Sequence, residues 1–146
     1  MAQSDVSNMA QSVDRTHCWS TAVLVVDDTD AIREFLKATL SRWGYFVDLA
    51  EHGVEALRCL SRRAYDVILT DIEMPQLDGV SLWRRAVEAG HPGAWILMTG
   101  STGPRCECAI PILRKPLRLQ ELQDALKRAA FRPSMRDQSS INSNRE

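Results

Sequence analysis

Short apolar runs alternate along the chain with longer segments whose apolar residues are spaced as on one side of a helix. Four of these runs span residues 23–26, 67–69, 94–98 and 110–113, and each is apolar throughout. Runs of this length and composition are typical of strands buried on both faces, as in the middle of a parallel sheet. A fifth run, residues 45–50, mixes polar with apolar positions, which suits an edge strand.

The segments between the runs predict helices. The first begins at Thr29 or Asp30, either of which can cap a helix, and ends at Gly44. Further helices are expected to begin at Gly53, at Gly79 and near residues 117–119. The apolar residues at helical spacing are Ile32, Leu36, Leu40 and Trp43 in the first helix, Val80, Trp83 and Val87 in the third, and Leu119, Leu122, Leu126 and Ala129 in the last.

A regular alternation of strand and helix predicts an α/β fold with a doubly wound parallel sheet, because right-handed crossovers place helices on both faces. For five strands the flavodoxin-like order 2-1-3-4-5 is the natural choice. This order sets the first and third strands side by side. The carboxyl ends of such strands form the edge of the sheet at which ligands bind.

Polar side chains stand where the predicted strands end. They are Asp27 and Asp28 after the first strand, Asp71 after the third, Thr99 after the fourth and Lys115 just beyond the fifth. Carboxylates held this close together do not all remain ionised unless a cation joins them. Oxygen ligands without His or Cys suit Mg²⁺, with Mn²⁺ as a substitute. Each residue alone also has an ordinary interpretation, since Asp27 could cap a helix, Thr99 could satisfy a strand end and Lys115 could be a solvated charge.

Together with Met74, Pro75, Asp78 and Gly79, this set resembles the receiver domain of two-component response regulators over roughly residues 22–130. The resemblance implies that Asp71 accepts a phosphoryl group from a phosphohistidine of a sensor histidine kinase or a histidine phosphotransfer protein. It also implies signalling through a changed affinity for a downstream protein, which the sequence does not identify. No catalysis is expected beyond the chain's own phosphorylation and dephosphorylation.

The resemblance assigns further roles at the same site. Asp28 and Asp71 are implied as direct Mg²⁺ ligands, Asp27 as a ligand directly or through water, and Glu73 as a ligand through its backbone carbonyl. The Glu73 side chain is implied to lie near the path of an attacking water. Lys115 is implied to offset charge in the transition state, and Thr99 to donate to a phosphoryl oxygen. The bond from Lys115 to Pro116 is implied to be cis.

The chain departs from the family between Thr99 and Lys115. Lys115 follows Thr99 by 16 positions, fewer than receivers usually have, and glycines and prolines interrupt this interval at Gly100, Gly103, Pro104 and Pro111. We therefore expect the fourth helix of the family to be short or absent. Ile112 occupies the switch position at which the family tends to place an aromatic residue, so a coupled threonine and aromatic switch is not expected.

Length and composition indicate one domain. The chain has 146 residues, of which 45% are hydrophobic, and its formal net charge of −1 does not favour nucleic-acid binding. We expect a flexible leader at residues 1–20, a receiver domain at 21–131 and a disordered tail at 132–146. The sequence shows neither a membrane span nor a signal peptide, and the cytoplasm is the expected location.

The four cysteines do not have the spacing of a zinc site and are expected to be free thiols. They are Cys18, Cys59, Cys106 and Cys108. Cys59 falls on the apolar side of a predicted helix, whereas Cys106 and Cys108 flank a loop.

Two other functions compete with a phosphorylated receiver. A haloacid-dehalogenase-type phosphatase also uses an aspartate nucleophile with Mg²⁺ after a first strand, but it needs a second acid two residues later. Thr29 stands at that position relative to Asp27. The other alternative is a pseudo-receiver, a binding scaffold in which phosphate has no role.

Overall fold

Five parallel strands form one sheet in the order β2-β1-β3-β4-β5. The computed structural model describes residues 21–101 and 110–131. The strands are β1 (Ala22–Val26), β2 (Phe46–Ala50), β3 (Val67–Asp71), β4 (Ala94–Thr99) and β5 (Ile112–Arg114). The predicted fold class and strand order are confirmed, with the more polar strand β2 at one edge.

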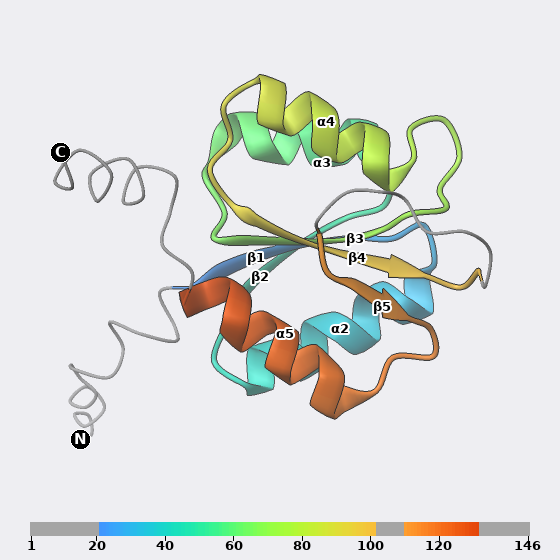
Figure 1. Cartoon of the computed structure of the whole chain (residues 1–146), viewed down its shortest axis with the longest axis vertical. Helices are drawn as coiled ribbons and strands as arrows, with labels where there is room; N and C mark the ends of the chain where they lie inside the picture. The colour runs from blue at the N-terminus through green and yellow to red at the C-terminus, as the bar shows by residue number, and fades with distance from the viewer. Residues whose placement is uncertain (1–20, 102–109, 132–146) are drawn as a thin grey trace, which may run out of the picture.

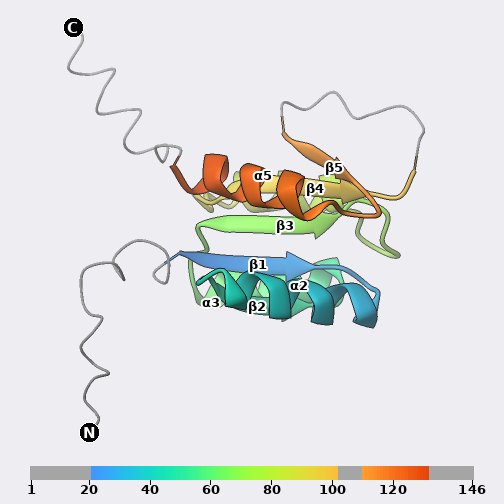
Figure 2. The same cartoon turned by 90° about the horizontal axis from the view of Figure 1, so that it is seen from below.

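Helices cover both faces of this sheet (Figures 1 and 2). Within the described residues, the helices are α2 (Asp30–Arg42), α3 (Gly53–Arg62), α4 (Gly79–Glu88) and α5 (Leu119–Phe131). Figure 1 shows α3 and α4 above the sheet and α2 and α5 below it. The sheet therefore separates two apolar cores.

The apolar run of β1 supplies both cores. Val23 and Val25 pack with α2 and α5 on one face, whereas Leu24 and Val26 pack with α3 and α4 on the other. Alternate side chains of a strand point to opposite faces, so only a strand covered on both sides is apolar at every position. The same burial on both faces explains the apolar residues of β3 and β4.

Strand β5 begins two residues later than the sequence predicts. Its pairing with β4 starts where Leu97 lies beside Ile112, and Pro111 stands immediately before that point. The Leu97 amide donates to the Pro111 carbonyl, but Pro111 has no N–H to donate in return. The proline thus marks the start of a strand of only three residues.

Two predicted helix positions prove exposed. Leu119 opens α5 and is 48% exposed, while Leu122 takes the first buried position of that helix. Val87 of α4 is 50% exposed, and the buried side of α4 carries Gly79, Leu82 and Ala86. A Cβ at Gly79 would collide with the backbone of Asp71 and Ile72, so only glycine allows α4 to approach β3 this closely. That close approach turns Val87 toward solvent.

Several predictions lie outside the described residues: the leader at 1–20, the tail at 132–146, Cys18, Cys106, Cys108 and the expected shortening of the helix between β4 and β5, whose residues 102–109 are not described. Cys59 is a free thiol on α3, partly buried against the core on that face. Among the described residues, no helix has both the length and the hydropathy that a membrane crossing requires.

Candidate functional site

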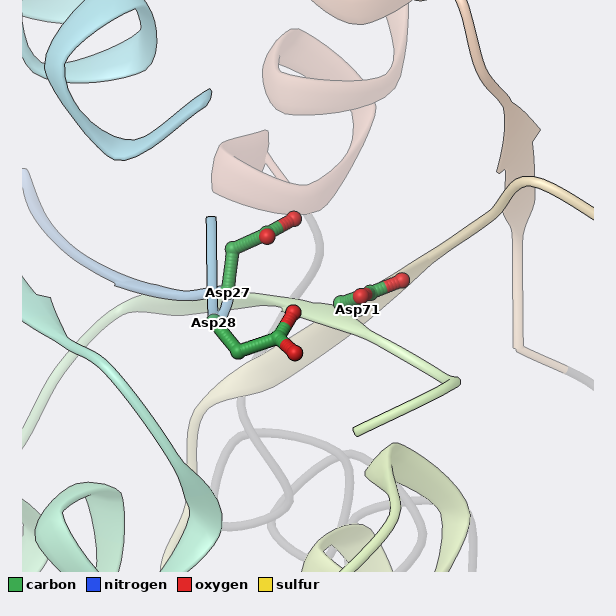
Figure 3. Close-up of side chains that lie close together, drawn as sticks. All are labelled: Asp27, Asp28 and Asp71. Carbon is green, nitrogen blue, oxygen red and sulfur yellow. The ribbon is translucent and has the colours of Figure 1, made fainter. Parts of the chain in front are cut away.

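Three carboxylates gather at the carboxyl ends of β1 and β3 (Figure 3). Asp27 and Asp28 follow β1, and Asp71 is the last residue of β3. Because β1 and β3 are parallel neighbours, with Val26 beside Thr70, both strands end at the same edge. One carboxylate oxygen from each of the three residues lies within 4.8 Å of the others.

Asp27 is fully buried, and each of its polar groups has a partner. Its amide donates to the Ala50 carbonyl at 3.2 Å. One carboxylate oxygen accepts from the Thr29 amide at 2.9 Å, and the other accepts from the Lys115 ammonium at 2.9 Å. The Arg33 guanidinium donates to the Asp27 carbonyl at 2.7 Å. Asp27 is thus held in place by residues of three other segments.

Asp71 is nearly as deeply buried, but its carboxylate has fewer hydrogen-bond donors. Its side chain is 5% exposed, and Oδ1 lies 3.4 Å from the Lys115 ammonium without accepting a hydrogen bond from any described residue. Burial, and next the charge of Asp27, raise the pKa of the Asp71 carboxyl to about 6, although Lys115 acts in the opposite direction. A buried carboxylate oxygen without a donor is well suited to binding a cation.

Lys115 connects β5 to both buried acids. It follows the last residue of β5, and its amide donates to the Thr99 carbonyl at 2.8 Å. Burial alone lowers the pKa of the ammonium, but its hydrogen bond to Asp27 and the charges of Asp71 and Asp27 outweigh burial and raise it. The peptide bond from Lys115 to Pro116 is cis. The ammonium therefore stays protonated between the two carboxylates.

Thr99 lies at the end of β4, where its hydroxyl donates to Glu73 Oε2 at 2.6 Å. The Gly100 amide donates to Oε1 of the same carboxylate at 3.2 Å, and the Ser101 amide donates to Thr99 Oγ1 at 3.0 Å. Ile112 is partly buried beside Leu97 at the start of β5. Thr99 is thus tied to the loop after β3.

Two contacts in the site were not predicted from the sequence. The carboxylate of Glu73 binds Thr99 and Gly100, although only its backbone carbonyl and its nearness to a water path were expected. Arg33 holds the backbone of Asp27 from the first turn of α2. The sequence could have indicated this contact, because Arg33 lies in the first turn of the helix that follows the two acids. A long side chain at that position can reach back to the backbone before the helix.

The donor set fits a hard divalent cation such as Mg²⁺. Asp28 is exposed, Asp71 Oδ1 is buried with no donor among the described residues, and both side chains offer only oxygen. The two carboxylate oxygens of Asp27 already have donors, so Asp27 fits this cation less directly.

Residues 23–127 match the family model described as the response regulator receiver domain. Response regulator MprA of Mycobacterium sp. (strain KMS) is 37% identical over 122 residues, which cover 80% of this chain and 53% of that protein. Protein-glutamate methylesterase/protein-glutamine glutaminase 3 of Hahella chejuensis (strain KCTC 2396) is 42% identical over 80 residues, which cover 54% of this chain and 23% of that protein. The chain spans about half the length of the MprA relatives that it matches.

Solved structures show the same architecture. The signal receiver domain of an HD domain-containing protein from Pseudomonas fluorescens Pf-5 superposes with a TM-score of 0.70 at 30% identity, covering 75% of this chain and 93% of that one. Response regulator protein TrrA from Thermotoga maritima, in complex with Mg(2+)-BeF, has a TM-score of 0.69 at 33% identity and covers 75% and 98%. The chain therefore belongs to the response regulator receiver domain family.

Proposed function

We propose that Asp71 accepts a phosphoryl group from a phosphohistidine of a sensor histidine kinase or a histidine phosphotransfer protein. The observation that carries this proposal is the state of Asp71 Oδ1, which is buried at a strand end, lies 3.4 Å from the Lys115 ammonium and accepts no hydrogen bond from the described residues. A carboxylate in this state can offer one oxygen to a metal ion and use the other as a nucleophile. The carboxylate of Asp27, by contrast, has a donor on each of its oxygens.

We further propose that Asp28, Asp71 and the backbone carbonyl of Glu73 hold Mg²⁺ directly and that Asp27 contacts it through water, with Mn²⁺ as a substitute. Bound there, the ion would neutralise charge on the phosphoryl oxygens. The complex of the similar TrrA structure with Mg(2+)-BeF supports this choice of metal.

The chain's own residues have distinct roles in the transfer. An oxygen of Asp71 forms the new bond to phosphorus while the bond from phosphorus to the donor imidazole breaks, and the imidazole takes up a proton from solvent. The Lys115 ammonium, which lies between Asp27 and Asp71, offsets charge that develops on the phosphoryl oxygens. The Thr99 hydroxyl donates to one of these oxygens in the product.

The product would change the affinity for a downstream protein, and the chain would catalyse only its own phosphorylation and dephosphorylation. The family supports a histidine kinase as the phosphodonor. The methylesterase relative carries most of its length outside the matched region, so its named activity supports no such activity for this chain.

Intact mass spectrometry after incubation with acetyl phosphate and Mg²⁺ tests the proposal. The wild type should gain one phosphoryl group, Asp71→Asn should gain none, and the matched control Asp124→Asn, a change on α5, should behave as the wild type. Asp28→Ala should lose Mg²⁺ affinity in a metal titration. If the affinity is unchanged, the assignment of Asp28 as a ligand is wrong.

Phosphoryl uptake and the release of inorganic phosphate separate the alternatives. No uptake by the wild type, from acetyl phosphate or from a phosphorylated histidine kinase, would favour a pseudo-receiver scaffold. Steady hydrolysis of unrelated phosphate esters would favour a phosphatase.

A further inference from the structure

The carboxylate of Glu73 occupies two hydrogen-bond donors at the end of β4. Oε2 accepts from the Thr99 hydroxyl at 2.6 Å, and Oε1 accepts from the Gly100 amide at 3.2 Å. Together these donors form a small cradle for an anion with two oxygens. The side chain that fills it belongs to Glu73, an exposed residue of the loop after β3, 26 residues earlier in the sequence.

We propose that Glu73 is an internal placeholder for the phosphoryl group: in the unphosphorylated protein its carboxylate occupies the donors that bind phosphoryl oxygens once Asp71 is modified. This inference rests on the proposed function, because it requires a phosphoryl group on Asp71. It adds a residue that controls access to the site and is neither the acceptor nor a side-chain metal ligand.

The register of the sheet puts this cradle beside the acceptor. Asp71 lies next to Met98 in the pairing of β3 with β4, and the Ile72 amide donates to the Met98 carbonyl at 2.8 Å. Thr99 follows Met98 directly. The acceptor and the cradle therefore lie at the ends of adjacent strands, at the same edge of the sheet.

The two anions compete because the donors are few. Thr99 has one hydroxyl proton, and its oxygen already accepts from the Ser101 amide, so this proton points to a single acceptor. Gly100 contributes one N–H. A carboxylate and a phosphoryl group are both anions with two or more acceptor oxygens, and both make short charge-assisted bonds to such donors.

Displacing Glu73 is easy because this residue is exposed, whereas Thr99 is 9% exposed. A released carboxylate regains water, while the buried hydroxyl keeps a partner in the phosphoryl oxygen. The exchange also breaks the hydrogen bonds that join Glu73 to the end of β4. Phosphorylation would thus release the Glu73 side chain, while Met74 and Leu77 stay buried in the core and the bond from the Gly79 amide to the Ile72 carbonyl holds the base of the loop.

Beryllofluoride with Mg²⁺, a phosphoryl mimic, measures the competition without turnover. Its affinity for the wild type, Glu73→Asp, Glu73→Gln and Glu73→Ala can be followed by NMR of the Gly100 amide. Glu73→Asp keeps the charge but is one methylene too short to reach the cradle, so it separates contact from charge. We expect Glu73→Asp and Glu73→Ala to bind beryllofluoride about five-fold more tightly than the wild type, and Glu73→Gln to fall between.

If Glu73→Asp binds no more tightly than the wild type, the placeholder is overturned, even if the two uncharged variants gain affinity. The contact has its own test in the absence of beryllofluoride. Glu73→Asp should shift the Gly100 amide resonance, and an unmoved resonance would overturn the inference while leaving the proposed function intact.

Failure of the proposed function has a different signature. In that case none of the four proteins binds beryllofluoride, and none gains a phosphoryl group from acetyl phosphate. The inference then fails with it. Thermal unfolding of each variant verifies folding, which the exposed position of Glu73 is expected to preserve.

Discussion

The ammonium of Lys115 lies 2.9 Å from a carboxylate oxygen of Asp27, although the two residues are 88 positions apart. Asp27 is fully buried and the Lys115 side chain is 21% exposed, so the pair is largely shielded from water. The contact joins the end of β5, at one edge of the sheet, to the end of β1 near its centre. It also brings the same ammonium within 3.4 Å of Asp71.

Lys115→Met should therefore destabilise the protein, because it leaves the buried charge of Asp27 without its cation. Breaking a buried pair from one side costs about 3 kcal/mol of unfolding free energy. Urea unfolding at pH 7 without Mg²⁺ measures this loss. Lys127→Met, at an exposed position of α5, is the matched control and should change the unfolding free energy little. Equal stability of the two variants would show that the Lys115 pair contributes nothing.

The raised pKa of Asp71 predicts a pH dependence of the metal-free protein. Its folded pKa of about 6 lies above its ordinary value of 3.8, so the folded protein binds the proton more tightly than the unfolded chain. The stability that this proton supplies is complete below about pH 4 and is lost as the pH rises through about 6. At pH 8 the ionised, buried carboxylate should then cost about 2 to 3 kcal/mol of unfolding free energy.

Asp71→Asn removes this cost. Without Mg²⁺, urea unfolding should show Asp71→Asn to be more stable than the wild type at pH 8, with the advantage shrinking toward pH 5. Mg²⁺ should reduce the difference in unfolding free energy at pH 8, because it binds the wild type more tightly than the variant. An advantage that is the same at pH 5 and pH 8 would contradict the assigned pKa.

Gly79→Ala should separate α4 from β3. The added Cβ would overlap backbone atoms of Asp71 and Ile72, which cannot give way as a flexible side chain could. We expect a loss of about 2 to 4 kcal/mol of unfolding free energy and weaker Mg²⁺ binding, since Asp71 must shift. Gly100→Ala is the control for stability, because a Cβ there meets no atom of the described residues within 4 Å. If Gly79→Ala unfolds at the same temperature as the wild type, then α4 tolerates being moved away from β3.

Arg33→Met should loosen Asp27 without removing any carboxylate. The variant loses the hydrogen bond from the guanidinium to the Asp27 carbonyl, which contributes about 1 kcal/mol. Isothermal titration with Mg²⁺ should show a few-fold weaker affinity, and thermal unfolding a modest loss. Arg42→Met, an exposed change in the last turn of α2, serves as the reference. If the two variants have the same Mg²⁺ affinity, Arg33 does not position the site.

Local patterns were sufficient for the fold. Residues 23–26 are apolar at every position because both faces of the strand are buried. This pattern can be recognised without knowing which residues pack against the strand. The position of Asp71 at a strand end followed in the same way, from an apolar run that stops at an acid. Where a short strand begins, or which side of α4 is buried, depended on single backbone contacts at Pro111 and Gly79 that periodicity does not contain.

The sequence by itself determined that three acids, a threonine and a lysine stand at the ends of strands in a parallel sheet, because strand ends are set by local composition. Only the tertiary structure decided how their hydrogen bonds are shared. Within residues 21–101 and 110–131 it gives Asp71 Oδ1 no donor, supplies a donor to each oxygen of Asp27 and places the carboxylate of Glu73 on Thr99. The physical reason is that hydrogen bonds depend on differences of an ångström between side chains far apart in the sequence, and those distances are fixed only when the helices and loops pack around the sheet.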